Sequence, residues 1–280
     1  MTTHRLYNEQ RFARVLDYLH QNYAQDMDLH RIAEEAALSP YHWHRIYRAV
    51  MNETIHATLK RIRLQRAAWL LGNSGKGVAE IAREVGYGGN QQSFARIFRE
   101  HFGVHPEDYR NRSHAPYPER AHIRARAYAV QIVDIAPISV LTLDHHGDYM
   151  AIGATFHQLY ALLQLRGHPV NARSFGIYHD DPHGKAAEEL YAQAAVQTQA
   201  QSADAPLVLR SIRGGRYAVL RHQGSYAELE HAYDWFYRDW LLASGEQIGN
   251  APPFEEYLND VQSTPPEQLL TDIYIPLAGD

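Results

Sequence analysis

The sequence of 280 residues contains no cysteine. A disulfide framework, a thiolate metal site and a cysteine nucleophile are therefore excluded. No apolar run reaches the length of a membrane span, and the first residues, MTTHRLYNEQRF, lack the apolar core of a signal peptide. Walker, dinucleotide-binding and nucleophile-elbow motifs are also missing. We therefore expect a cytoplasmic protein without a cofactor, long enough to form two domains.

The two parts of the chain carry opposite net charge, although the whole has a net charge of −5. Residues 1–120 hold 17 Lys and Arg against 13 Asp and Glu, whereas residues 121–280 hold 10 against 19. This division favours a protein in which only the first part meets phosphate. Such an asymmetry also arises by chance, so it supports nucleic-acid binding without deciding it.

The 18 histidines raise the question of a metal site. His42 and His44 are separated by one residue on a predicted helix, so they point to different sides. The adjacent His145 and His146 face apart in a predicted strand. Neither pair has the spacing of four that places two ligands on one helical face. We therefore predict no metal site.

Residues 81–109, IAREVGYGGNQQSFARIFREHFGVHPEDY, have the pattern of a helix-turn-helix. A short apolar-periodic helix stops at Gly86, which suits the left-handed cap after a helix, and the turn 88–90 follows. The apolar face of the second helix is Phe94, Ile97 and Phe98. Its free face consists of Gln91, Gln92, Ala95, Arg96 and Arg99. Gln pairs with adenine and Arg with guanine, so this face suits the major groove. An ordinary helical hairpin is the alternative.

Residues 28–50 predict another such unit. Asp28 can cap a short helix, and Ser39-Pro40 has the form of an N-cap followed by proline at the first helical position. We expect the next helix to pack through Trp43, Ile46, Tyr47 and Val50 and to leave free Tyr41, His44, Arg45 and Arg48.

Two further helices are expected around these units. Residues 8–23 predict a helix with Asn8 as its N-cap, and residues 55–71 predict a longer helix between the two units. Two helix-turn-helix units spaced by one helix could reach successive major-groove faces about 34 Å apart.

Residues 8–112 resemble the DNA-binding domain of the AraC/XylS family of bacterial transcription regulators. The matching residues are Ile32-Ala33, Leu38-Ser39, His42, Arg45-Ile46-Tyr47, Arg63-Leu64, Ala67, Leu70-Leu71, Ile81-Ala82, Gly86-Tyr87, Phe94, Arg96, Phe98, Gly103, Pro106 and Tyr109-Arg110. The resemblance implies that the groove-facing residues are Tyr41, His44, Arg45, Arg48, Gln91, Gln92 and Arg96.

The same resemblance implies phosphate contacts and shows two departures. Lys60, Arg61 and Arg99 are candidates to hold phosphate, and a merely solvated face is the alternative for the two arginines. Ala37 stands where the family usually has glycine in the first turn, and the turn 88–90 is one residue longer than usual.

A second domain is expected over residues 123–280, after a first domain over 1–112 and a proline-containing linker over 113–122, SHAPYPERAH. From Tyr128 the chain becomes rich in β-branched residues, which predicts one or two strands.

The C-terminal half contains an internal duplication, which is visible when this half is shifted against itself. The motif Leu143–Tyr149, LDHHGDY, corresponds to Leu220–Tyr226, LRHQGSY. The predicted helix 156–163 corresponds to 233–240, and 177–181 corresponds to 256–260 at a slightly larger offset. Each unit reads strand, glycine turn, helix, strand, with 271–277 as a closing strand. We predict an α+β domain with pseudo-two-fold symmetry and a ligand groove between its halves.

Residues 126–278 resemble the GyrI-like family of small-molecule-binding domains. The matching residues are His146–Tyr149, His222–Tyr226, Trp240, Phe254–Asp260 and Thr271–Leu277. In that family a glutamate inside an aromatic cleft commonly meets cationic or amphipathic ligands, and the matching carboxylate is Glu255. The implied ligand-binding residues are Glu255, Tyr149, Tyr226, Trp240 and Tyr257.

A carboxylate among aromatic rings can bind a cation by ion pairing and by stacking on the rings. The alternatives are an exposed acidic turn at Glu255-Glu256, and core positions beside turns for Tyr149 and Tyr226.

The sequence therefore predicts a multidomain protein, with an all-α tandem helix-turn-helix domain followed by an α+β duplicated domain. We expect a non-enzymatic transcription regulator that binds double-stranded promoter DNA and senses a hydrophobic or cationic, drug-like effector, with RNA polymerase as a further partner and no membrane association. The alternatives for the C-terminal half are a small-molecule hydrolase, in which Glu255 activates water, a sequestering domain and a protein-interaction module.

Overall fold

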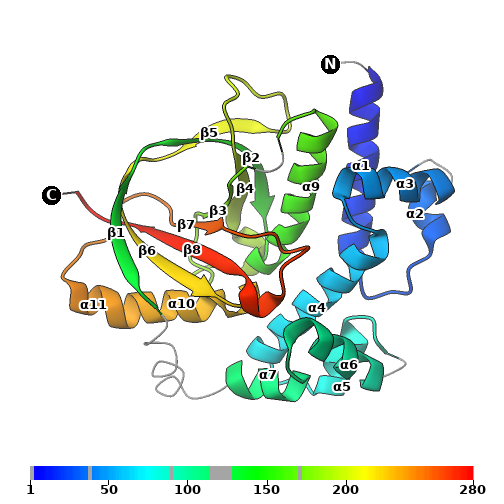
Figure 1. Cartoon of the computed structure of the whole chain (residues 1–280), viewed down its shortest axis with the longest axis horizontal. Helices are drawn as coiled ribbons and strands as arrows, with labels where there is room; N and C mark the ends of the chain where they lie inside the picture. The colour runs from blue at the N-terminus through cyan, green and yellow to red at the C-terminus, as the bar shows by residue number, and fades with distance from the viewer. Residues whose placement is uncertain (1–2, 37–39, 89–90, 114–127, 170–171, 280) are drawn as a thin grey trace. The chain divides into compact units, whose positions relative to one another are not determined.

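The computed structural model describes residues 3–36, 40–88, 91–113, 128–169 and 172–279 (Figure 1). By packing, the chain forms two compact units, Met1–Arg110 with Gly153–Asn171, and Asn111–Ile152 with Ala172–Asp280. The predicted linker 113–122 lies outside the described residues apart from Ser113. Among the described helices none has the length and apolar character of a membrane span.

The helical unit contains seven consecutive helices and one from later in the chain. They are α1 (Thr3–Gln21), α2 (Leu29–Glu35), α3 (Pro40–Met51), α4 (Ile55–Asn73), α5 (Val78–Glu84), α6 (Gln91–Phe102), α7 (Pro106–Ser113) and α9 (Ile152–Leu165). The pairs α2–α3 and α5–α6 form the two predicted helix-turn-helix units, with α4 between them. The predicted start of the first helix is wrong, because α1 begins at Thr3 and Asn8 lies inside it.

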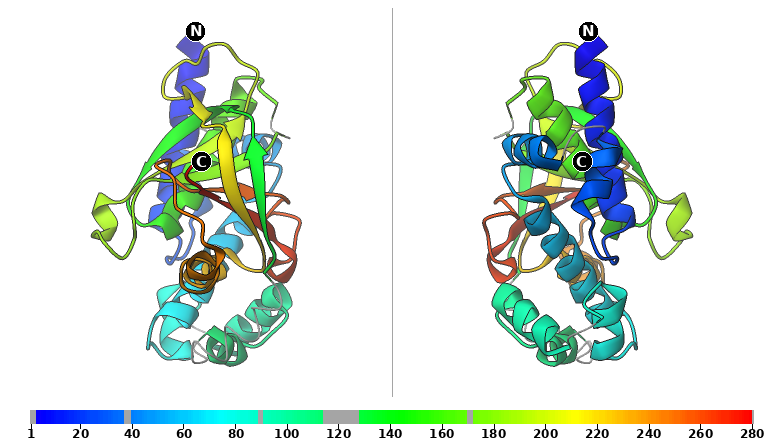
Figure 2. Two further views of the ribbon diagram at one scale, coloured as in Figure 1. Left: turned by 90° about the vertical axis from the view of Figure 1, so that its left-hand side faces the viewer. Right: turned by 90° about the vertical axis from the view of Figure 1, so that its right-hand side faces the viewer.

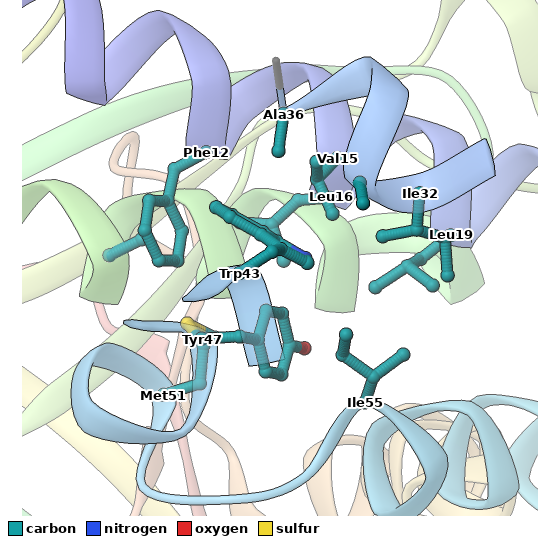
Figure 3. Close-up of a cluster of buried hydrophobic side chains, with 12 residues drawn as sticks. Phe12, Val15, Leu16, Leu19, Ile32, Ala36, Trp43, Tyr47, Met51 and Ile55 are labelled. Carbon is teal, nitrogen blue, oxygen red and sulfur yellow. The ribbon is translucent and has the colours of Figure 1, made fainter. Parts of the chain in front are cut away.

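The core of the first helix-turn-helix unit is one aromatic and aliphatic cluster (Figure 3). Phe12 of α1 packs on Trp43 of α3 with ring centroids 4.8 Å apart. Trp43, Tyr47 and Met51 are buried at a spacing of four, so the packed face of α3 is narrow. Ile46 falls beside that face and is 39% exposed, which corrects the prediction that it packs inward. Asp28 caps α2 as predicted, accepting from the amide of His30.

The second helix-turn-helix unit packs through phenylalanines at the same spacing. Phe94, Phe98 and Phe102 of α6 are buried, and Phe98 stacks on Phe102 with centroids 4.4 Å apart. Gly86 follows α5 with φ of 84°, which confirms the predicted left-handed cap. A Cβ on Gly86 would lie 2.7 Å from the carbonyl oxygen of Ala24, so the chain approaches closely there. The positions of Ala37 and of residues 89–90 in the two turns lie outside the described residues.

The second unit is built on one antiparallel sheet of eight strands. These are β1 (Val130–Ile135), β2 (Ile138–His146), β3 (Ser174–Tyr178), β4 (Tyr191–Gln197), β5 (Val208–Ile212), β6 (Gly215–Gln223), β7 (Phe254–Tyr257) and β8 (Leu270–Pro276), in the order β1-β6-β8-β7-β3-β4-β2-β5. Val133 of β1 and Ile212 of β5 belong to one hydrophobic cluster although their strands are opposite edges of the sheet. The sheet therefore curls around that cluster, as the views in Figures 1 and 2 show.

The sheet confirms the duplication and extends it. β2 and β6 have the same length and carry the two copies of the repeated motif, and the two repeats are β1-β2-α9-β3-β4 and β5-β6-α10-β7-β8. Here α10 is Leu229–Trp235, continued by a π-helical segment, η4 (Phe236–Trp240), and α11 (Leu241–Ser244). Each repeat has four strands rather than the predicted two. The predicted closing strand 271–277 is β8 in essence, and its counterpart in the first repeat is β4.

The two faces of the sheet have different partners. Tyr217 and Phe254 lie inside the curl, whereas Ala218 and Ile273 pack with Phe236 on the face that α10 covers. Because side chains alternate along a strand, Phe254 inside the curl directs the next residue, Glu255, to the α10 face.

Candidate functional site

Four residues of the sheet unit form a hydrogen-bonded cluster on the α10 face, which we call the tyrosine–glutamate cluster: Glu255, Tyr178, Tyr233 and Tyr257. Tyr233 of α10 donates to Oε1 of Glu255 at 3.1 Å. Tyr257 and Tyr178 donate to Oε2 at 2.9 and 3.2 Å. The hydroxyls of Tyr178 and Tyr257 also lie 2.8 Å apart. Two strands and one helix thus direct three hydroxyls at one carboxylate.

Glu255 is buried and its charge has no cationic partner among the described residues. Its side chain is part of a residue that is only 4% exposed, and no described residue forms an ion pair with it. Burial raises the pKa of Glu255 from 4.5 to about 7, although the hydrogen bonds from Tyr257, Tyr233 and Tyr178 oppose the rise. Burial also raises the pKa of each of these tyrosines well above its usual value. The phenols therefore stay protonated and act as donors.

The environment of Glu255 excludes the exposed acidic turn that the sequence left open. Glu255 lies in β7, and its neighbour Glu256 is also buried, at 6% exposure, on the opposite face of the sheet. Glu256 binds Arg173 through two hydrogen bonds of 2.6 and 2.7 Å and accepts another from Tyr274. Glu256 is thus compensated, whereas Glu255 is surrounded by hydroxyls and aromatic rings.

Tyr149 and Tyr226 extend the cluster on both sides. The ring of Tyr149 meets Tyr178 edge-on, with centroids 4.9 Å apart, and the ring of Tyr226 meets Tyr257 in the same way at 5.3 Å. The Tyr149 hydroxyl donates to backbone carbonyls, including that of Tyr191 at 2.9 Å. Tyr149 therefore presents its ring rather than a free hydroxyl.

The structure places Trp240 elsewhere. It lies at the end of η4 and stacks on Phe236, with centroids 5.0 Å apart, at the edge of the cluster of hydrophobic residues beneath α10. Tyr178 and Tyr233 are the residues that sequence reasoning missed. Tyr178 aligns with Tyr257 in the duplication, so the repeat itself held the signal for one of them.

Polar side chains on α3 and α6 form the candidate nucleic-acid interface. On α3, Arg45 and Arg48 are exposed and His44 is partly buried, while the side chain of Tyr41 lies outside the described part of the chain. On α6, Gln91, Gln92 and Arg96 are exposed, as predicted for a groove-facing surface. Arg96 pairs with Glu100 one turn later at 2.6 Å.

Of the three predicted phosphate contacts, Lys60 and Arg99 are exposed and Arg61 is not. Arg61 is 7% exposed, binds Glu53 at 2.5 Å and lies 3.0 Å from Nε2 of His157 on α9. Its guanidinium is therefore committed to the interior of the helical unit, which corrects the prediction for this residue. Within the described residues no group of three or more histidine or acidic side chains is arranged to hold a metal ion.

Two family profiles match the chain. Residues 128–278 match the GyrI-like small molecule binding domain, and residues 32–112 match a helix-turn-helix domain. The first match covers more than half of the chain, so the chain belongs to the GyrI-like family. Together the two domains define an AraC-type DNA-binding transcription regulator with a GyrI-like small-molecule-binding domain.

Individual relatives match one domain each. "Probable transcriptional regulator YgiV" of Escherichia coli K12 is 31% identical over 153 residues, covering 53% of this chain and 96% of the relative. "Regulatory protein SoxS" of Salmonella typhimurium is 29% identical over 98 residues, covering 35% of this chain and 91% of the relative. Among solved structures, an EcmrR–DNA complex aligns with 89% of this chain and 85% of its own, at 14% identity and a TM-score of 0.48.

Proposed function

We propose that the chain is a one-component regulator whose sheet unit senses an aromatic or amphipathic molecule with one positive charge. The observation that carries this proposal is the buried carboxylate of Glu255, held by three tyrosine hydroxyls and lacking a cationic partner in the part of the chain that the structure describes. A carboxylate in such a place is costly when ionised. A bound cation compensates the charge and gains cation–π contacts with the rings.

The partial exposure of the tyrosines supports this proposal. Tyr178, Tyr233 and Tyr257 are each intermediate between buried and exposed, whereas Glu255 is buried behind them. A ligand would therefore meet aromatic rings before the carboxylate. Neutral aromatic molecules can use the rings alone, so selectivity for positive charge reports on Glu255 specifically.

The test compares two ligands of the same shape, the permanent cation 10-methylacridinium and neutral acridine, by fluorescence titration of the full chain at mildly alkaline pH. We expect the wild type to prefer the cation, and Glu255→Gln to lose roughly tenfold to a hundredfold of that preference, the worth of one charge-assisted contact. Glu188→Gln changes the same charge at an exposed position and serves as the control.

Two results would overturn the cation-sensing proposal. Equal affinity of the wild type for both ligands would show that no uncompensated acid is accessible. An unchanged preference in Glu255→Gln would place the selectivity elsewhere. Conversion of a ligand to a product during the incubation would support the hydrolase alternative instead.

We further propose that α3 and α6 read promoter DNA, with RNA polymerase as a partner of the bound regulator. The exposed Arg48, Gln91, Gln92 and Arg96 supply the donors and acceptors that base edges recognise. A duplex selected from a random pool should lose about 1–3 kcal/mol of binding free energy with Arg96→Ala and relax its sequence preference at one position. Arg14→Ala, exposed on α1, is the matched control. Equal losses for both variants would contradict base reading by α6.

A further inference from the structure

The two repeats of the sheet unit meet between β3 and β7. When the repeats are exchanged, the strand order β1-β6-β8-β7-β3-β4-β2-β5 reads the same from the opposite edge. β3 and β7 are therefore equivalent strands that pair antiparallel across a pseudo-two-fold axis. The tyrosine–glutamate cluster is built around this junction.

The tyrosines beside the junction obey the symmetry. Tyr178 and Tyr257 are equivalent because each is the last residue of its strand, and their hydroxyls meet at 2.8 Å. Tyr149 and Tyr226 are equivalent because each begins the short 3-10 helix after the glycine motif. Each of them packs edge-on against the tyrosine of its own repeat, at interplanar angles of 68° and 62°. Both repeats thus contribute the same pair of rings.

Glu255 breaks the symmetry, and the break falls at one position. Counted back from the tyrosine that ends each strand, the equivalent of Glu255 is Gly176, and these two are also direct partners in the register of β3 and β7. A symmetric sequence would set two carboxylates against each other, and like charges so close strongly disfavour ionisation of both. The chain has one acid and one glycine instead.

The glycine is required by side-chain room and not by its backbone. Gly176 lies within a regular strand and is not among the residues with positive φ. A Cβ at this position would lie 2.7 Å from the hydroxyl of Tyr257 and 2.8 Å from that of Tyr178. These are the hydroxyls that donate to Oε2 of Glu255. They occupy the space that any other residue would fill.

We propose that Gly176 is a positioning residue of the effector site, whose missing side chain lets the hydroxyls of Tyr178 and Tyr257 converge on Glu255 and thereby sets the site for a single positive charge. This inference rests on the cation-sensing function proposed above. An added methyl group at residue 176 displaces one or both hydroxyls. The carboxylate then loses donors that stabilise its ionised form, and the ionised form is the one that binds a cation.

The test uses the full chain with 10-methylacridinium and acridine, and compares the wild type, Gly176→Ala and Glu255→Gln. We expect Gly176→Ala to lose about tenfold of the preference for the cation, as for the loss of a charge-assisted hydrogen bond, while its affinity for acridine changes little. The pH above which cation binding saturates should also move upward, because Glu255 ionises less readily. Gly153→Ala is the matched control, since a Cβ there meets no atom within 4 Å.

A second measurement separates loss of positioning from general damage. Tyr257→Phe removes the atom nearest the added methyl group, so the cost of Gly176→Ala to cation binding should be smaller in the Tyr257→Phe background than in the wild type. If Gly176→Ala does not fold, the comparison of Tyr257→Phe with Tyr257→Phe/Gly176→Ala takes its place, and the double variant should bind the cation as the single one does.

The outcomes distinguish the two proposals. A cation preference that Glu255→Gln abolishes and Gly176→Ala leaves intact would overturn the role of Gly176 and leave the sensing function standing. Equal costs of Gly176→Ala in both backgrounds would also overturn it, because the hydroxyl of Tyr257 would then be irrelevant. Absence of any cation preference in the wild type would overturn the sensing function itself, and the role of Gly176 with it.

Discussion

Glu255→Gln should stabilise the ligand-free protein at neutral and alkaline pH. Gln keeps the shape of Glu255 and can still accept from hydroxyls, but it carries no charge in a residue that is 4% exposed. The wild type holds a carboxylate whose pKa burial raises from 4.5 to about 7. Ionising it in the folded chain therefore costs more than ionising it in the unfolded chain.

The pKa fixes the sign and the size of the effect. Between pH 4.5 and about 7 the folded chain binds the Glu255 proton while the unfolded chain has released it, so the stability contribution of Glu255 is present below pH 4.5 and is lost as pH rises through about 7. The loss is about 3 kcal/mol across this window. Because Gln does not titrate, the free energy of unfolding of Glu255→Gln minus that of the wild type should rise by about the same amount.

The assay is urea unfolding of the full chain, followed by tryptophan fluorescence at a series of pH values. The difference between the two proteins cancels the titration of the groups that they share, and Glu188→Gln should give a difference that does not vary with pH. A flat difference for Glu255→Gln would refute the argument, because it would mean that Glu255 titrates alike in the folded and unfolded chains. A variant less stable than the wild type above pH 7 would refute it as well.

Three further stability predictions concern the helical unit. Arg166→Met should cost about 3–5 kcal/mol in urea unfolding, because it removes the partner of the Glu9 carboxylate in an ion pair whose side chains are 2% and 5% exposed. Burial lowers the pKa of His20 to about 4 and that of His157 well below 6.5, so stability should fall with pH below 6.5, by about 1.4 kcal/mol per pH unit for each histidine, and His157→Gln should flatten that slope. Gly86→Ala should cost more than about 1 kcal/mol, measured by thermal unfolding, because φ is 84° and a backbone carbonyl lies 2.7 Å from the new Cβ.

The sequence predicted local features whose cause is local. The helix-turn-helix pairs followed from periodic apolar residues and from caps such as Asp28 and Gly86. The prediction for Ile46 was wrong because four residues at helical spacing define a wider face than α2 and α1 cover, and Trp43 and Tyr47 fill it. The prediction for Arg61 was wrong because its partners, Glu53 and a histidine on α9, are brought together by the fold.

The candidate site was predicted in part for the same reason. Glu255 and Tyr257 alternate with Glu256 on one strand, so their common face follows from the pleat. Tyr233 comes from a helix and Gly176 from a neighbouring strand, and neither can be placed without the register of the sheet. The offset between the repeats becomes larger after the helices, so Gly176 is aligned with Glu255 only once β3 and β7 are known.

Helix α9 shows that repeat and packing assign one element to different parts of the molecule. It stands between β2 and β3 as α10 stands between β6 and β7, so it belongs to the first repeat by sequence, yet it packs within the helical unit. Its Ala161 lies in the core cluster of the first helix-turn-helix unit, and Arg166, just beyond its end, binds Glu9. A fragment of residues 1–112 would keep both helix-turn-helix units but lose these contacts. We expect that fragment to unfold at lower urea concentration than the helical unit of the full chain, and an equal midpoint would show that α9 contributes nothing to it.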